Sequence, residues 1–136
     1  MNVARREIEG IEVLDLEGRL TAGAESGALR EEVTTLVHEG KNSIVLNLKQ
    51  VDSIDSSGLG TVVVCFAALQ HQGGALKLAN LAPRHKELLA LTKLTTVLES
   101  FDDERDAVNS FFPDRTRKRS AVREQVLEYA RTLGAA

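Results

Sequence analysis

The 136-residue chain is poor in aromatic residues, which make up 4% of it, and it has a single tyrosine and no tryptophan. Proteins that bind single-stranded nucleic acids stack bases on aromatic side chains, so this composition argues against that function. The lone cysteine, Cys65, excludes an internal disulfide and fits a reducing compartment. No apolar run approaches the roughly 18–20 residues of a membrane span, and the polar start lacks a secretory signal. We expect a cytoplasmic protein without a membrane segment.

Positive charge is scarce except near the C-terminus. Residues 1–112 hold 11 Lys and Arg against 17 Asp and Glu, whereas residues 113–136 hold 6 against 3. An acidic body argues against direct nucleic-acid binding as the main function, because such binding rests on contacts to phosphate. The length and the 43% hydrophobic content fit one globular domain. We predict a domain at 1–112 and a basic C-terminal extension at 113–136.

Strand and helix patterns alternate along the chain. Period-2 alternation and β-branched runs predict strands within 3–9, 11–20, 43–48, 75–79 and 97–101. Helical spacing and end signals predict helices at 24–39, 59–72, 83–91 and 103–111. Glu9-Gly10 is predicted to be a hairpin turn at or near a sheet edge, and residues 49–56 a loop. This order predicts an α/β fold with a mixed, mostly parallel sheet flanked by helices.

The most distinctive segment is VDSIDSSGLG at residues 51–60, which connects a predicted interior strand to a helix. Ligands and partners of open α/β sheets meet the loops at the carboxyl ends of strands. Asp55, Ser56 and Ser57 are also good N-cap residues, so helix capping alone is one interpretation. The segment lacks the Gly-Lys-Ser/Thr of a P-loop and the Gly-x-Ser-x-Gly of a nucleophile elbow. We therefore predict no catalytic residue and no cofactor.

The helix after this segment has no charged residue between Leu59 and Leu69. Its larger apolar residues are predicted to face the sheet, which leaves an outer stripe of Thr61, Val64, Cys65 and Ala68. An exposed helix normally carries charges on its outer side. Two interpretations stay open: other parts of the domain bury this stripe, or it is a docking face for a partner.

Five further motifs accompany this segment in a fixed order. They are GRL at 18–20, IVLNL at 44–48, LKLANLAP at 76–83, LTKL at 91–94 and FDDERDA at 101–107. In this order and spacing the motifs resemble the STAS domain, specifically that of bacterial anti-sigma factor antagonists, over about residues 4–112. The resemblance implies the STAS fold and a regulatory switch in place of an enzyme.

The resemblance also implies a phosphorylation site and a partner. In this family the serine directly before the glycine accepts the phosphate, which corresponds to Ser57. The unphosphorylated protein binds an anti-sigma factor that is also an ATP-dependent serine kinase, thereby freeing the sigma factor, and a serine phosphatase resets the cycle. We predict that the partner-binding residues are Leu20, Thr21, Asp55, Ser56, Ser57, Gly58, Leu59, Gly60, Thr61 and Val64.

Thr21 departs from the family pattern, in which the better-known antagonists carry an aspartate at this position. An acidic contact near Ser57 is therefore missing, which leaves the use of phosphorylation open while binding could survive. The alternative function is that of a STAS scaffold or accessory subunit, in a stress-sensing assembly or a lipid-transport complex, that does not act on a sigma factor.

The basic extension contains one apolar stripe, formed by Val122, Val126, Tyr129 and Leu133 after the N-cap candidate Ser120. It predicts an extra C-terminal helix, packed on the domain or on a second copy in a homodimer. A partner-binding tail and nucleic-acid contact are the less favoured interpretations. The three histidines, His38, His71 and His85, lack metal-ligand spacing, so we predict no metal site.

Overall fold

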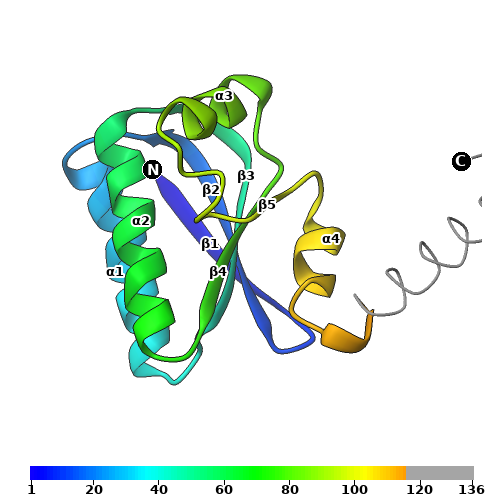
Figure 1. The fold of residues 1–136 in the computed structure, drawn as a ribbon. Helices are drawn as coiled ribbons and strands as arrows, with labels where there is room; N and C mark the ends of the chain where they lie inside the picture. The colour runs from blue at the N-terminus through cyan, green and yellow to red at the C-terminus, as the bar shows by residue number, and fades with distance from the viewer. Residues whose placement is uncertain (116–136) are drawn as a thin grey trace, which may run out of the picture.

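The computed structural model describes residues 1–115, apart from the side chains of residues 24 and 25, as a five-stranded sheet with helices on both faces (Figure 1). The strands are β1 (Asn2–Ile8), β2 (Ile11–Leu20), β3 (Ser43–Ile54), β4 (Ala75–Ala79) and β5 (Ser100–Phe101). The helices are α1 (Ala24–His38), α2 (Ser56–His71), α3 (Pro83–Leu91) and α4 (Glu104–Asn109). The predicted α/β class with a mixed, mostly parallel sheet is confirmed.

The sheet has the order β1-β2-β3-β4-β5, with β1 antiparallel to β2 and the other neighbours parallel. The first two strands are joined by Glu9 and Gly10, whose φ angles of 53° and 84° match a two-residue hairpin turn that follows the sheet twist. The edge strand β1 is mostly exposed and carries charged side chains, which discourage pairing with other chains. The predicted turn and edge position are therefore confirmed.

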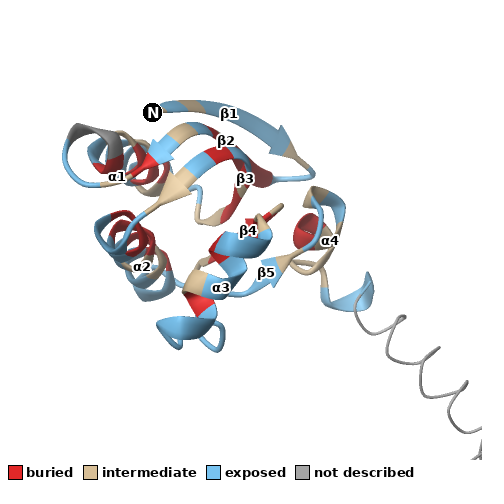
Figure 2. Cartoon of the chain, turned by 90° about the horizontal axis from the view of Figure 1, so that it is seen from above, coloured by how far each residue is buried: buried red, intermediate tan, exposed pale blue. Residues whose placement is uncertain are grey.

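Two apolar clusters lie on opposite faces of the sheet because successive strand residues point to opposite sides. On β3, Ile44 and Leu46 join the larger cluster, which packs against α1, α2 and α3. Val45, between them, joins the smaller cluster, which packs against Ala107 and Val108 of α4. Figure 2, which looks along the sheet from above, shows α1 and α2 on one side and α4 on the other. The core is thus thick on one face and thin on the other.

Two strands differ in length from the prediction. Strand β3 continues through residues 49–54, predicted as a loop, because it pairs there with β2 up to the Leu20–Ile54 pair. Several of its residues in this part are polar and exposed, so no apolar run marks them as a strand. The strand predicted at 97–101 is reduced to two residues. The amides of Val97 and Leu98 both donate to the carbonyl of Leu94, which makes a turn there.

The predicted helix of the C-terminal extension lies outside the described residues, as do its apolar stripe and most of its basic residues. The division into residues 1–112 and 113–136, and a homodimer through the extension, stay predictions. Within residues 1–115, no helix is both long enough and apolar enough to cross a membrane.

Candidate functional site

The DSSG motif lies where β3 ends and α2 begins. We use the name β3–α2 loop for residues 52–58, which comprise the last three residues of β3, Asp55 and the first turn of α2. Asp55, Ser56 and Ser57 are exposed, whereas Gly58 is buried. The two serines form the first turn of α2, which contains no acidic side chain. The first N–H groups of a helix point outward and carry its positive dipole end. Ser57 is therefore exposed at the positive dipole end of α2, two residues after the capping carboxylate of Asp55.

Asp55 is the N-cap of α2. Its backbone is extended, with φ −107° and ψ 179°, and its Oδ1 accepts a hydrogen bond from the Gly58 amide at 2.7 Å. Its backbone oxygen accepts the first helical bond, from the Leu59 amide at 2.9 Å. This confirms the capping interpretation for Asp55. It also separates the roles of the motif, since the aspartate starts the helix and the serines remain on its surface.

Gly58 sets how closely α2 approaches the end of β2. A Cβ atom at this position would lie 1.8 Å from the Leu20 carbonyl oxygen and 2.5 Å from its carbon, so only glycine fits. The Leu20 oxygen also accepts a hydrogen bond from the Asp55 amide at 3.3 Å. The fully buried Leu20 thus fixes the β3–α2 loop against β2.

An uncharged stripe runs along α2 from Ser57. Gly60, Val64 and Ala67 follow it at helical spacing and are exposed, with Val64 50% exposed. Of the outer stripe predicted from the sequence, Val64 and Ala68 are exposed, whereas Thr61 is 5% and Cys65 2% exposed. Burial by other parts of the domain, one of the two open interpretations, therefore holds for Thr61 and Cys65. They face inward because α2 packs against α1 as well as the sheet, which widens its buried side. The stripe itself is not buried by other described residues.

The predicted partner-binding residues divide by exposure. Asp55, Ser56, Ser57, Gly60 and Val64 are exposed, and Thr21 is half-buried; the buried members are Leu20, Gly58, Leu59 and Thr61. The buried residues shape the site but offer no side-chain surface to a partner. Contact through the exposed ones stays a prediction. Thr21 lies beside the start of α1, where the Ser26 hydroxyl donates to its carbonyl oxygen.

Sequence reasoning missed one contact of this site. The guanidinium of Arg84, from the first turn of α3, donates to the Asp52 carbonyl oxygen, with an Nη2–O distance of 2.5 Å. Arginine on an exposed helix turn looks like an ordinary surface residue in the sequence, and only the fold shows that α3 reaches the end of β3. No sequence signal would have identified this contact.

Comparison with known proteins connects this geometry to a family. A sequence model of the STAS domain matches residues 2–107. The chain belongs to the STAS domain family. The anti-sigma-B factor antagonist of Bacillus subtilis is 38% identical over 71 residues, which is 52% of this chain and 64% of that protein. The anti-sigma F factor antagonist of Paenibacillus polymyxa is 31% identical over 65 residues, 48% of this chain and 56% of that protein. Both matches span less than two thirds of the relative.

Solved structures support the fold assignment. The structure of the Bacillus cell fate determinant SpoIIAA in the phosphorylated form has a TM-score of 0.63 to this chain at 20% sequence identity. The likeness covers 81% of this chain and 99% of SpoIIAA. At this level of identity the comparison shows a shared fold. It confirms that residues of this chain form the STAS fold predicted from the motifs.

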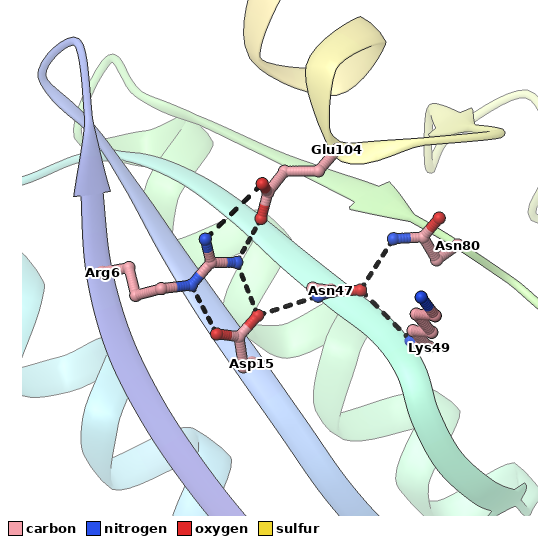
Figure 3. Close-up of polar contacts among 6 residues, drawn as sticks. All are labelled: Arg6, Asp15, Asn47, Lys49, Asn80 and Glu104. Carbon is pink, nitrogen blue, oxygen red and sulfur yellow. Dashed lines mark hydrogen bonds and ion pairs between the residues drawn. The ribbon is translucent and has the colours of Figure 1, made fainter.

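A second polar cluster of this STAS domain lies on the α4 face of the sheet (Figure 3). Arg6 of β1 donates to Asp15 of β2 with distances of 2.5 and 2.8 Å, and also pairs with Glu104 of α4. Asn47 donates to Asp15 at 2.8 Å and accepts from Asn80 at 2.9 Å. A hollow of about 470 Å³ lies beside this cluster. Its central polar groups already bond one another, so we assign the cluster a structural role.

Neither the cysteine nor the histidines add a reactive group to the site. Cys65 is buried, and burial raises the pKa of its thiol to about 11, which disfavours the nucleophilic thiolate. His38 and His71 are exposed, whereas His85 is only 4% exposed. Burial, and secondly the charge of Arg84, lower the pKa of His85. The exposed hydroxyl groups of the site are those of Ser56 and Ser57.

Proposed function

We propose that this chain is an anti-sigma factor antagonist. In its unphosphorylated form it binds an anti-sigma factor that is also a serine kinase, and phosphorylation of Ser57 releases that partner. The observation that carries the proposal is the exposed Ser57 at the start of an uncharged, exposed stripe on α2. The relatives named as anti-sigma factor antagonists support the same function.

The exposed α2 stripe suits a partner that covers Ser57. Gly60 and Ala67 have small or no side chains, and a Cβ on Gly60 would meet nothing within 4 Å. A partner can therefore approach the helix closely, with Val64 as the largest apolar contact. Burying an uncharged stripe avoids the desolvation cost that ionised side chains would bring. These features favour an interface along the first three turns of α2.

Phosphorylation of Ser57 would oppose that interface and leave the fold intact. A phosphoserine adds about −1.5 to −2 charges at neutral pH. Within the isolated protein, the helix N-terminus favours this charge. In the complex, the phosphate would have to be desolvated at the same helix end as the exposed carboxylate of Asp55, whose like charge also repels it. Loss of the interface, and not unfolding, is therefore the expected signal.

The first experiment tests phosphorylation. The protein is incubated with the anti-sigma factor kinases of its native host and ATP, and phosphopeptides are located by mass spectrometry. We expect one phosphate on Ser57, lost in Ser57→Ala and retained in the matched variant Ser56→Ala. Because Thr21 replaces the aspartate of the better-known antagonists, this experiment decides whether the chain is phosphorylated at all. Absence of phosphate, together with a stable complex that ATP does not dissolve, would instead support a STAS scaffold or accessory subunit.

The second experiment separates binding from folding. Ser57→Asp and Val64→Asp each place a charge on the stripe, and both are expected to weaken binding of the anti-sigma factor by tenfold or more, about 1.4 kcal/mol. Their helical circular dichroism and melting temperature should stay close to those of the wild type, because both sites are exposed. If Ser57→Asp lost its helical signal, unfolding would be the signal and the proposed mechanism would fail.

A further inference from the structure

Within residues 1–115, the end of β3 has a strand neighbour on one side and none on the other. Strand β4 pairs with β3 only from Ser43 to Asn47, whereas β2 stays paired with β3 as far as Ile54. Among the described strands, only β2 therefore pairs with the last part of β3. Such a one-sided strand end is less restrained than a central strand, and local opening begins where backbone contacts are few and exposed.

Arg84 contacts β3 in this one-sided part. Its Nη2 lies 2.5 Å from the backbone oxygen of Asp52, three residues before the N-cap Asp55. A hydrogen bond from a charged donor to a carbonyl is stronger than one between neutral groups. The contact comes from the first turn of α3, and thus from a segment 32 residues further along the chain. It links α3 to the strand end that leads into Ser57.

The turn that carries Arg84 is itself anchored. The neighbouring His85 is 4% exposed, and neither of its ring nitrogens has a hydrogen-bond partner among the described residues. Its ring is therefore held by burial, and the amides of His85 and Lys86 both donate to the Ala82 oxygen at 2.9 and 3.0 Å. Pro83 at the first helical position fixes the backbone further. Arg84 thus extends from a well-restrained helix start.

We propose that Arg84 is a positioning residue that holds the β3–α2 loop through the Asp52 carbonyl and thereby sets the place of Ser57. The loop is then held from two sides. On one side the Leu20 oxygen bonds the Asp55 amide and contacts Gly58, and on the other Arg84 bonds Asp52. Loss of Arg84 frees only the second side, so the loop opens locally while the domain stays folded.

Hydrogen–deuterium exchange of the full chain tests this proposal. Arg84→Met keeps an apolar stem of similar length and removes every donor. We expect amides of residues 53–58 to exchange at least about fivefold faster, with amides of 44–47 unchanged. Lys86→Met is the matched control, because Lys86 lies on the same helix and, among the part of the chain that the structure describes, its side chain pairs with the exposed Asp102 alone, at 3.0 Å. Arg84→Lys, which retains a charged donor, should recover most of the slow exchange.

Either of two results would overturn the proposal: unchanged exchange in Arg84→Met, or equally faster exchange in Lys86→Met. A functional readout rests on the proposed function. With the anti-sigma factor as the probe, Arg84→Met should bind at least about threefold more weakly and Arg84→Lys close to wild type. If the wild type binds no anti-sigma factor, the proposed function fails, and the exchange experiment still decides whether Arg84 positions the loop.

Discussion

The two faces of the sheet differ in how much apolar packing holds them. On the face that carries α1, α2 and α3, a large apolar cluster does the packing, and the candidate site is fixed by backbone contacts at Leu20 and Gly58. On the α4 face the apolar cluster is small, and side-chain pairs among Arg6, Asp15 and Glu104 connect three elements. On the other face, Arg5 of β1 pairs with Glu32 of α1 at 3.3 Å and with Glu39 at 2.8 Å. Salt and pH should therefore act on the ion pairs of both faces, and least on the backbone contacts that hold the β3–α2 loop.

The largest expected effect comes from the adjacent residues Leu46 and Val45, which point to opposite faces of β3. Both are fully buried. Leu46→Ala should lower the free energy of unfolding by about 2–5 kcal/mol, through lost transfer energy and a cavity in the large cluster. Val45→Ala removes one carbon fewer and should cost roughly 1 kcal/mol less. Urea unfolding of the two variants measures the difference. Equal losses would show that the α4 face contributes as much packing as the other.

The second effect concerns two glycines of α2. Gly58→Ala places a methyl group against the Leu20 carbonyl and should destabilise the domain by about 1–3 kcal/mol or more, because backbone must move. Gly60→Ala is the matched control: its Cβ meets nothing within 4 Å, so it should stabilise the helix by about 0.5–1 kcal/mol. Thermal melts of the two variants should shift in opposite directions. Shifts of the same sign would contradict the close approach of α2 to β2.

The fold was predictable from the sequence where the structure depends on a few neighbouring residues. The hairpin at Glu9-Gly10, the helix with Pro83 in its first turn and the capping by Asp55 all depend on local residue chemistry. The end of β3 was not predictable, because its backbone pairs with β2 while its polar side chains give no alternation to read. Periodicity leaves open whether Thr61 and Cys65 are buried, because their burial depends on the packing of α1 against α2, a tertiary contact that the local pattern does not contain.

The candidate site was predictable only in part. The DSSG motif identifies Ser56, Ser57 and Gly58 in the sequence. The expected α/β topology places this motif at the carboxyl end of a strand. The exposed and buried members could not be separated, since Gly58 and Gly60 look alike in sequence while one abuts Leu20 and the other faces open space. Arg84 and the Arg6–Asp15 pair join residues from distant segments. Only folding brings such side chains together.

The third effect compares two helix caps on opposite faces. Asp55 and Asp103 each accept a hydrogen bond of 2.7 Å from the backbone amide three residues ahead, at the starts of α2 and α4. Replacing either by alanine should cost about 0.5–2 kcal/mol. We expect the loss at Asp55 to be the larger, because α2 is 16 residues long and packs into the large cluster, whereas α4 is 6 residues long and packs into the small one. Chemical unfolding of the two variants tests this order. A larger loss of unfolding free energy in Asp103→Ala than in Asp55→Ala would show that the cap of α4 contributes more to stability than the cap of α2.

The smallest effect comes from the ionic contacts of the α4 face. The Arg6 side chain is 42% exposed and that of Asp15 is 33% exposed, so Asp15→Asn should cost no more than about 1 kcal/mol, less at high salt. Asp102→Asn is the control, because Asp102 is 88% exposed and its pair with Lys86 should contribute almost nothing. Unfolding in low and high salt measures both. If high salt did not reduce the loss of unfolding free energy in Asp15→Asn, packing and not charge would hold this face.

The same pair gives the domain a defined pH dependence. Hydrogen bonding from Arg6, and to a lesser extent from Asn47, lowers the pKa of Asp15 against the opposing effect of burial. A carboxyl whose pKa is lower in the folded state stabilises the fold above its unfolded pKa, and this contribution is lost as the pH falls through the folded value. The stability difference between wild type and Asp15→Asn should therefore be constant near neutral pH and shrink below about pH 4. A difference that grew on acidification would mean that the pKa of Asp15 is raised in the folded protein, and the ionic account of the α4 face would then be wrong.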